Sequence, residues 1–467
     1  MDITVERFED FRLIQNVAVL GAGNGGKAVA ADLALQGLNV RLFEWAEYRA
    51  NIAELLEEPV IQATGVVEGE AELSLVTTDL AEAIEDAEVV IACLQGLAHA
   101  RLANELAPII RDGAILVLNP GSTGGALEMR RIFSEHRIDK YLLLCETGTL
   151  THCCRARGPR EVHIGLRVNH IAFAALPGAA TADLHQALQP LFPGLKAKRD
   201  VLEVALCNGN PVIHPAIMLA NAAVIEQRGA DHRFYREGVT PAVARIIERV
   251  DRERIALGKA LGYDLLSEPR MCLEQGYSQS EDYLECYASS PVFGDLESPP
   301  GMEHRYLHED CGLGLVTYVS LGKLLGVPTP VSRSLATLAG SVTGRNYLKD
   351  GRRTVERLGL AGMDEAAREE YLQAPRRIGG VGTYKVPGGF RRKWGSETRP
   401  NPCASRDSRP TCSSLRQSSS SRSTCCTRSC IPACSAPIHG APSIPPGCTW
   451  GWTITATCSR TPTSCYP

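Results

Sequence analysis

The sequence has little net charge and no long apolar run, and these absences exclude several classes of protein. A net charge of −4 over 467 residues gives no basic surface for nucleic acid. No apolar run approaches the roughly 20 residues that a membrane-spanning helix needs. The charged first fifteen residues also lack the apolar segment of a signal peptide. We therefore expect a cytoplasmic protein that binds neither nucleic acid nor a membrane.

The cysteines of the first 387 residues lack the spacing of a metal site or a disulfide framework. These eight residues show no CxxC pattern and no paired-histidine motif. We interpret them as reduced core thiols and expect no bound metal. They are Cys93, Cys145, Cys153, Cys154, Cys207, Cys272, Cys286 and Cys311.

The composition changes after Gly388. Beyond it, nine further cysteines accompany ten Arg or Lys and only two acidic residues, and neither helical nor strand periodicity is present. Our leading hypothesis for this segment is out-of-frame translation of GC-rich coding DNA. The alternatives are a disordered tail or a small cysteine-rich domain, in which Cys425, Cys426, Cys430 and Cys434 could bind a soft metal.

The stretch from Asn16 to Trp45 predicts a strand, a glycine turn, a helix and a second strand. Its GAGNGG sequence places glycines at the fingerprint positions of a dinucleotide site, Gly21, Gly23 and Gly26. The first glycine permits a sharp turn, the second leaves room for a pyrophosphate, and the third lets the helix lie close to the strand. We expect the helix to cover residues 27–36 and to offer its amino end to the phosphates.

Glu44 ends the second strand, about twenty residues beyond the glycines. A carboxylate at this position accepts hydrogen bonds from both ribose hydroxyls of NAD and repels the 2′-phosphate of NADP. The sequence therefore predicts that NAD(H) is preferred over NADP(H). The structural alternative is a surface charge at the end of a strand.

Strands and helices alternate up to about residue 195, which predicts a doubly wound parallel sheet. Ligands of such sheets lie beyond the carboxyl ends of the strands, where a second glycine-rich turn, residues 119–125, also lies. We expect a helix over residues 47–58. Strands at residues 162–166 and 170–175 should complete the sheet.

The periodicity beyond residue 195 is helical. The expected helices span residues 204–226, 241–261, 312–325, 332–342, 351–358 and 364–372. The sequence thus predicts an α/β domain over residues 1–195, an all-α domain over residues 196–375, and a linker with a tail over residues 376–467.

Two prolines interrupt the first helical segment of the all-α domain. Pro211 suits a first helical turn, whereas Pro215 cannot donate a hydrogen bond to the carbonyl of Pro211, so we expect a kink at His214. A kink would turn the imidazole toward a cleft, where it could act as an acid or base near neutral pH. The alternative is a buried histidine bonded to a neighbouring Asn.

Arg305 and Asp310 lie five residues apart, which is a poor spacing for one helix face. We place Arg305 on a loop, where its guanidinium can hold a carboxylate through two hydrogen bonds. Asp310 would start a helix, where it can cap the helix and accept from an imidazole. A surface ion pair and a plain helix cap are the alternatives.

Five segments resemble the octopine/opine dehydrogenase family, and they occur in that family's order between about Asn16 and Leu372. The resemblance implies an α/β Rossmann domain followed by an all-α opine dehydrogenase domain, with substrates bound between them. It also implies an NAD(P)-dependent enzyme that condenses an amino acid with a 2-oxo acid such as pyruvate. The segments are GAGNGGKAVAADLALQG, LNPGSTGGALEMRRIF, CETGTLTHCCRARG, NGNPVIHPAIMLAN and RYLHEDCGLGL.

The resemblance also implies roles for single residues. His214 would be the acid or base, Arg305 the carboxylate anchor, and Asp310 the partner that orients His214. The other expected substrate-binding residues are Asn208, Glu146 and Thr147. The expected cofactor-binding residues are Gly21, Gly23, Asn24, Gly25, Gly26, Glu44, Leu94, His99, Asn119 and Gly121.

Two segments depart from the family pattern. Residues 95–98 replace a common Pro-Ala pair before His99, and Thr151-His152 replaces a usual Pro-Tyr pair. We expect both segments to border the nicotinamide. Two other functions stay open, a 2-hydroxy acid or polyol-phosphate dehydrogenase and a non-catalytic NAD-sensing protein. We also expect a homodimer.

A chain that ends near residue 387 should fold and oxidise NADH like the full chain, because the segment beyond Gly388 has no core-forming period. Matching thermal unfolding and matching NADH turnover of the two chains would agree with this prediction. Loss of cooperative unfolding or of activity on truncation would instead show that the segment is a genuine domain.

Overall fold

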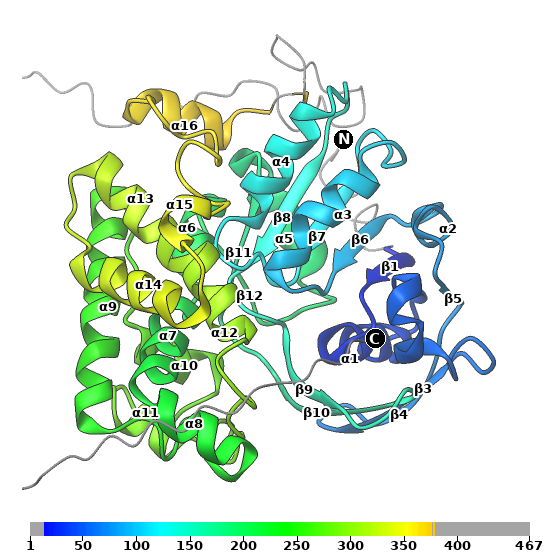
Figure 1. Ribbon diagram of the computed structural model, residues 1–467. Coiled ribbons are helices and arrows are strands. Elements are labelled where there is room, and N and C mark those ends of the chain that lie inside the picture. Colours follow the sequence, from blue (N-terminus) through cyan, green and yellow to red (C-terminus); the bar gives the residue numbers. More distant parts are fainter. Residues whose placement is uncertain (1–13, 376, 379–467) are drawn as a thin grey trace, which may run out of the picture. The chain divides into compact units, whose positions relative to one another are not determined.

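The computed structural model describes residues 14–375, 377 and 378 (Figure 1). These residues belong to one compact unit. The predicted tail, residues 376–467, lies outside the described residues apart from Arg377 and Ile378, and so do the hypotheses about it. Among the described helices, none has the length and apolarity to cross a bilayer.

The main sheet contains eight strands, which are β1 (Asn16–Leu20), β2 (Asn39–Phe43), β5 (Leu75–Thr77), β6 (Val89–Ala92), β7 (Ile115–Leu118), β8 (Leu143–Thr147), β11 (Ile171–Leu176) and β12 (Leu195–Ala197). Their order is β12-β11-β8-β7-β6-β1-β2-β5. The strands from β8 to β5 are parallel, and β11 runs antiparallel to β8. The order reverses between β1 and β6, which is where doubly wound sheets bind ligands.

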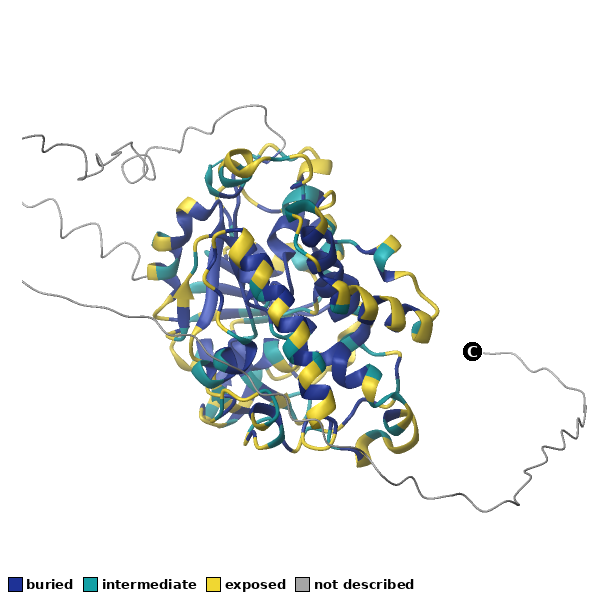
Figure 2. Cartoon of the chain, turned by 90° about the vertical axis from the view of Figure 1, so that its left-hand side faces the viewer, coloured by how far each residue is buried: buried dark blue, intermediate teal, exposed yellow. Residues whose placement is uncertain are grey.

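The central strands form the core of this sheet. Val17–Leu20 and Val89–Ala92 are buried along their whole length, as expected for parallel strands that are covered on both faces. Figure 2 shows buried residues in the strands and on the inner faces of the helices, with exposed residues on the outer faces. The apolar runs of the sequence therefore mark these strands correctly.

Helices connect the parallel strands. They are α1 (Asn24–Leu35), α2 (Leu80–Ile84), α3 (His99–Leu106), α4 (Gly125–Glu135) and α5 (Thr181–Leu188). The expected helix over residues 47–58 is wrong, because a 3₁₀ helix, η1 (Ala46–Ile52), and turns occupy this segment. Tyr48 leaves the helical region, and the Asn51 side chain turns back to donate to Glu44 over 3.1 Å.

A second sheet lies against α1 (Figure 1). It contains β3 (Val60–Gly65), β4 (Gly69–Glu72), β9 (His152–Ala156) and β10 (Glu161–Arg167), in the order β4-β3-β10-β9. Residues 162–166 lie in β10 of this second sheet, so the expectation that they complete the main sheet is wrong. The strand expected at residues 170–175 is β11, which does join the main sheet. Burial alternates along most of β10, as it does in a strand with one covered face.

The remainder of the described chain is helical. Its elements are α6 (Val201–Leu206), α7 (Asn210–Ala220), α8 (Ala222–Arg228), η4 (Gly229–Asp231), α9 (Pro241–Ala260), α10 (Glu268–Gln275), α11 (Glu285–Ala288), α12 (Arg305–His308), the π-helix η5 (Asp310–Leu315), α13 (Val316–Leu325), α14 (Pro330–Thr343), α15 (Tyr347–Asp350) and α16 (Glu365–Gln373). The α/β region followed by helices confirms the expected fold class.

The expected single helix over residues 204–226 is three helices. The chain leaves helical structure before α7 and again at Asn221, whose side chain donates to the carbonyls of Ile217 and Gly238. The kink expected at His214 does not end the helix, because α7 continues through Pro215. The tertiary bonds of Asn221, rather than the proline, set the end of α7.

Asp32 on α1 joins this helix to the second sheet. Its carboxylate is 1% exposed and lies 2.7 Å from His152 Nε2 on β9, and it accepts two hydrogen bonds from Arg167 on β10. Burial acts to raise the pKa of Asp32, but the hydrogen bonds from Arg167 and His152 outweigh burial and hold the pKa well below its ordinary range. His152, which we expected beside the nicotinamide, is therefore buried against α1.

Asp32→Asn should lower the free energy of unfolding at pH 7 by about 3 kcal/mol, because it breaks a buried charged network. A carboxylate with a lowered folded pKa stabilises the protein above its unfolded pKa of about 4, and this stability is lost as the pH falls through the folded pKa. The difference in free energy of unfolding between the wild type and the variant should therefore shrink in acid. Denaturant unfolding of both proteins from pH 7 to pH 3 measures this difference.

Asp86→Asn is the matched control, since Asp86 pairs with Arg41 while 70% exposed. It should cost less than about 1 kcal/mol at any pH. Equal effects of the two variants, or a deficit of Asp32→Asn that grows in acid, would contradict the role given to Asp32.

Candidate active site

The first glycine turn lies at the reversal point of the main sheet. Gly21 has a φ of +98°, a region that glycine adopts without strain. A Cβ on Gly26 would lie 1.6 Å from the carbonyl oxygen of Gly21, so only glycine lets α1 pack this closely on the turn. A Cβ on Gly23 would meet nothing within 4 Å. This open backbone and the uncapped amino end of α1 fit a bound pyrophosphate.

The neighbours of the turn hold it in place. Asn24 accepts a hydrogen bond from the amide of Ala156 on β9 through its side chain, over 2.9 Å. Leu150 packs beside Gly25, and Leu94 packs beside Gly21. The structure thus brings the predicted residues Asn24, Gly25 and Leu94 to the turn, where they support the backbone that a dinucleotide would contact.

Glu44 turns inward from the end of β2. It is 4% exposed, and its carboxylate accepts from the amides of Ala22 and Trp45 and from the Asn51 side chain, at 2.9–3.1 Å. Glu44 is therefore not a surface charge at the end of a strand. The hydrogen bond from Ala22 fixes the carboxylate beside the glycine turn, which is where a ribose would lie.

The second glycine turn follows β7. Ser122, Thr123 and Gly124 have successive positive φ values of 51°, 69° and 90°. A Cβ on Gly121 would lie 2.5 Å from the Glu146 carboxylate, so the turn needs glycine there. The Asn119 side chain donates to Thr151 Oγ1 over 2.8 Å and joins this turn to the segment after β8.

The predicted substrate residues Glu146 and Thr147 are buried, and Oε1 of Glu146 has no hydrogen-bond partner within the described residues. Glu146 is 0% exposed and accepts from the amide of Ala126 at the start of α4. Burial raises the pKa of Glu146 to about 7. Thr147 donates to the carbonyl of Thr149, and Asn208 donates to Thr123 Oγ1. All these residues lie around the second turn, where their role in binding substrate stays a prediction.

Arg353 reaches from the helical region into the second turn. Its buried guanidinium donates to Glu128 and to the carbonyls of Gly121, Ser122, Thr123 and Gly96. It also contacts Nδ1 of His99, and burial lowers the pKa of His99 well below its ordinary value. His99 is thus a buried support of the turn. The expected helix over residues 351–358 is wrong, because these residues form turns that deliver Arg353.

His214 and Asp310 form a buried hydrogen-bonded pair. The distance from His214 Nδ1 to Asp310 Oδ2 is 2.7 Å, and both side chains are at most 4% exposed. Burial disfavours a charge on either group alone: it lowers the pKa of His214 well below its ordinary value and raises the pKa of Asp310. The alternative of a histidine bonded to a neighbouring Asn is wrong, because its partner is Asp310.

Two tyrosines that were not predicted from the sequence contact the imidazole of His214. The hydroxyl of Tyr235 lies 2.9 Å from His214 Nε2. The ring of Tyr306 stacks on the imidazole, with centroids 3.8 Å apart and an interplanar angle of 19°. Tyr306 adjoins Arg305 in the motif that carried the resemblance, so its position was a usable signal. Tyr235 lies in a turn outside every quoted motif.

Arg305 begins α12 instead of lying on a loop, and Asp310 begins the π-helix η5 without capping it. Arg305 Nη1 lies 3.9 Å from Glu309, and the guanidinium lies 5.1 Å from the centre of the Tyr306 ring. Arg305 is 37% exposed and donates no hydrogen bond within the described residues. Its donors are therefore available to a carboxylate next to His214.

The π-helix lies against the start of α7. A Cβ on Gly314 would lie 2.2 Å from Pro211 Cγ, so glycine permits the close approach. The amide of Gly314 also bonds to the carbonyl of Glu309, five residues back. This packing brings Asp310 and His214 together.

Comparison with known proteins identifies the family. The family described as NAD-dependent glycerol-3-phosphate dehydrogenase N-terminus matches residues 16–129, and the one described as NAD/NADP octopine/nopaline dehydrogenase, alpha-helical domain, matches residues 197–343. An opine dehydrogenase from Arthrobacter sp. (strain 1C) is 36% identical over 353 residues, which cover 75% of this chain and 96% of that protein. The chain belongs to the opine dehydrogenase family.

Other members support this assignment. Vitopine synthase from Allorhizobium ampelinum is 29% identical over 363 residues, which cover 75% of this chain and 97% of that protein. A solved octopine dehydrogenase with NADH and L-arginine has the same fold, with a TM-score of 0.63 at 20% identity over 80% of this chain and all of that one. The family is an NAD(H)-binding group of oxidoreductases that act on CH–NH donors. The 2-hydroxy acid, polyol-phosphate and sensor alternatives are not favoured.

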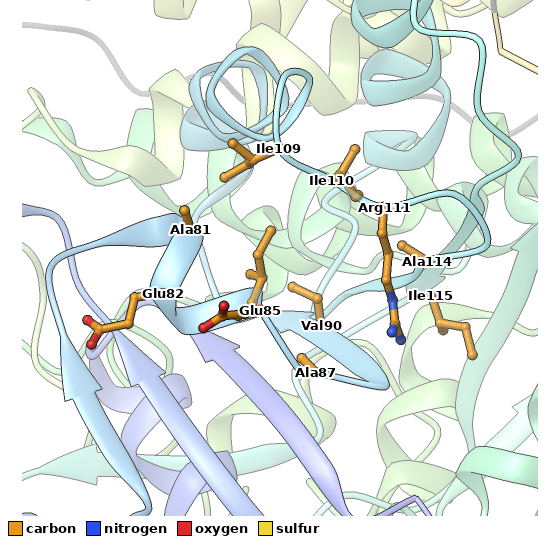
Figure 3. Close-up of a pocket in the computed structure, with 11 residues that line it drawn as sticks. Ala81, Glu82, Glu85, Ala87, Val90, Ile109, Ile110, Arg111, Ala114 and Ile115 are labelled. Atoms are coloured by element: carbon orange, nitrogen blue, oxygen red, sulfur yellow. The ribbon is translucent and has the colours of Figure 1, made fainter.

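Two further features of the chain are a surface pocket and a cluster of potential metal ligands. Figure 3 shows a pocket lined by Glu82, Glu85 and Arg111 near the amino ends of β6 and β7, at the opposite edge of the sheet from the glycine turns. Glu268, Cys272 and Cys286 bring potential metal ligands within 4.8 Å of one another. In this cluster Cys272 donates a hydrogen bond to Glu268. Its hydrogen bond with Cys286 raises the pKa of Cys272 well above its ordinary value, which favours the protonated thiol.

Proposed function

We propose that this opine dehydrogenase condenses the amine of an amino acid with a 2-oxo acid such as pyruvate and reduces the imine with NADH. The observation that carries the proposal is the buried His214–Asp310 pair beside Arg305, a cation with no hydrogen-bonded partner within the described residues. The names of the relatives, which include octopine and tauropine dehydrogenases, support this substrate class.

The proposed roles follow from the chemistry of these groups. His214 acts as the acid and base, Asp310 orients its imidazole, and Arg305 holds a substrate carboxylate through paired hydrogen bonds. We assign the ionised form to Asp310 in the base form of the pair, so that Nδ1–H of His214 donates to the carboxylate 2.7 Å away and Nε2 is the acceptor. Imine formation needs a neutral amine, and loss of the carbinolamine hydroxyl needs a proton. One histidine can take the first proton and return it for the second step.

The glycine turns and Glu44 hold the dinucleotide in this proposal. When bound, the nicotinamide supplies the hydride for the reduction. Burial of His214 and its stack on Tyr306 keep water from the imidazole, so proton transfer is confined to the groups around it. Residues 1–195 would then serve as the dinucleotide domain and residues 196–375 as the substrate domain. A cytoplasmic location and a homodimer stay predictions from the sequence.

NADH should be the better cofactor, with a kcat/KM at least about ten-fold above that of NADPH, because the Glu44 carboxylate repels a 2′-phosphate. Glu44→Gln should narrow this ratio, since the amide retains much of the geometry and loses the charge. Steady-state rates with both cofactors measure the effect.

Arg41→Gln is the control for this charge effect, because Arg41 lies on the same strand but bonds to Asp86 and to the carbonyl of Glu82. It should leave the cofactor ratio unchanged. A wild-type enzyme that uses NADPH as well as NADH would disprove the role of Glu44.

His214→Ala should lower kcat by about a hundred- to ten-thousand-fold while NADH binding is retained. Asp310→Asn should reproduce much of this loss, and the double variant should be little worse than His214→Ala, since the pair acts as a unit. Arg305→Lys keeps the charge but loses the paired hydrogen bonds, so it should first raise the KM for the oxo acid.

Steady-state kinetics with NADH, together with thermal unfolding of each variant, test these three roles. Additive losses in the double variant, or a near wild-type kcat for His214→Ala, would mean that the roles belong to other residues.

A further inference from the structure

Both nitrogens of His214 are engaged in the structure. Nδ1 bonds to Asp310, and Nε2 lies 2.9 Å from the hydroxyl of Tyr235. Tyr306 covers one face of the ring, and the whole residue is 3% exposed. A substrate amine therefore cannot reach a nitrogen of His214 without either displacing Tyr235 or acting through it.

The ring of Tyr235 is held firmly in place. It stacks on Phe293 with centroids 4.9 Å apart and meets Phe234 edge-on at 5.0 Å. It also stacks on Tyr287 at 6.2 Å, and Tyr235 is 5% exposed. Displacement of this side chain would break these aromatic contacts, which stabilise the ring beyond its burial alone. The geometry therefore favours transfer through the hydroxyl over its removal.

A tyrosine hydroxyl has one proton to donate and two lone pairs that accept. In the proposed base form, Nδ1–H of His214 donates to Asp310, so Nε2 is an acceptor and the Tyr235 hydroxyl donates to it. Tyr235 makes no other hydrogen bond within the described residues. Its oxygen thus keeps acceptor capacity for a group of the substrate.

We propose that Tyr235 is a catalytic residue that carries protons between the substrate and His214, and this proposal rests on the proposed function. In the first transfer, the substrate ammonium gives a proton to the Tyr235 oxygen as the Tyr235 proton moves to Nε2. The products are a neutral amine, a neutral tyrosine and an imidazolium beside the Asp310 carboxylate. In the second transfer, Nε2–H returns its proton to Tyr235, and the Tyr235 proton moves to the carbinolamine hydroxyl, which leaves as water.

The tyrosine stays neutral in both transfers. Burial raises the pKa of Tyr235 well above its ordinary value, so a phenolate is disfavoured and each proton must leave the oxygen as another arrives. The charge instead rests on His214, where the carboxylate of Asp310 lies 2.7 Å away. Proton transfer thus involves the buried side chains of Tyr235, His214 and Asp310.

Tyr235→Phe tests the relay, because it removes the hydroxyl and keeps the ring contacts. The substrates are the amino acid and 2-oxo acid that the wild-type enzyme condenses fastest in a screen with NADH. We expect kcat to fall about a hundred-fold with NADH binding unchanged. The kinetic isotope effect with deuterated NADH should also decrease, because proton transfer before the reduction becomes limiting. Tyr235→Phe on a His214→Ala background should cause little further loss.

Tyr287→Phe is the matched control. Tyr287 is also buried and stacks near Tyr235, but its hydroxyl has no hydrogen-bond partner within the described residues. This variant should keep the wild-type kcat and isotope effect. Equal kcat for wild type and Tyr235→Phe would overturn the relay, and so would a faster Tyr235→Phe enzyme, which would make Tyr235 a block on Nε2. A wild-type enzyme that condenses no pair at all would instead overturn the proposed function.

Discussion

The hydrogen bonds of the buried Arg353 guanidinium are the interaction that joins the second glycine turn and the segment after β6 to the helical region. An arginine has five N–H donors in a fixed plane, and Arg353 directs them at Glu128, His99 and the carbonyls after β6 and β7. Glu128 is itself 0% exposed, and its buried charge is compensated by Arg353 at 2.9 Å and by Arg352 at 3.4 Å. A lysine could not satisfy this set of carbonyls, because its single ammonium has no planar fork.

The same interaction explains a limit of sequence-based prediction. The first glycine turn and the strands beside it were predictable, because apolar runs and a glycine pattern are local signals. The strand, turn, helix and second strand predicted for residues 16–45 are β1, the first glycine turn, α1 and β2. The expected helix over residues 351–358 failed, because Arg353 is drawn out of helical structure by partners more than 220 residues away. Local periodicity carries no information about such partners.

The site was predictable in part, and for a different reason. The resemblance brought His214, Arg305 and Asp310 to attention together, and the structure places His214 against Asp310. Tyr235 could not have been found in this way. It lies in a turn 21 residues beyond His214, and no local pattern of the sequence distinguishes it from the other tyrosines. Only the contact of its hydroxyl with Nε2 separates it from the other buried tyrosines, and that contact depends on the packing of α7 against the turn before α9.

The five-residue spacing of Arg305 and Asp310 shows how an apparent mismatch can carry information. On an α-helix, this spacing separates two side chains, which led us to place Arg305 outside the helix. The structure instead inserts a π-helical turn after α12, and π turns occur frequently at functional sites. Gly314 then packs against Pro211 at the start of α7, one turn before His214. The glycine and the proline are therefore a matched pair, since their contact lets η5 approach α7 closely enough for Asp310 to meet the imidazole. Arg305, five residues before Asp310, donates no hydrogen bond within the described residues.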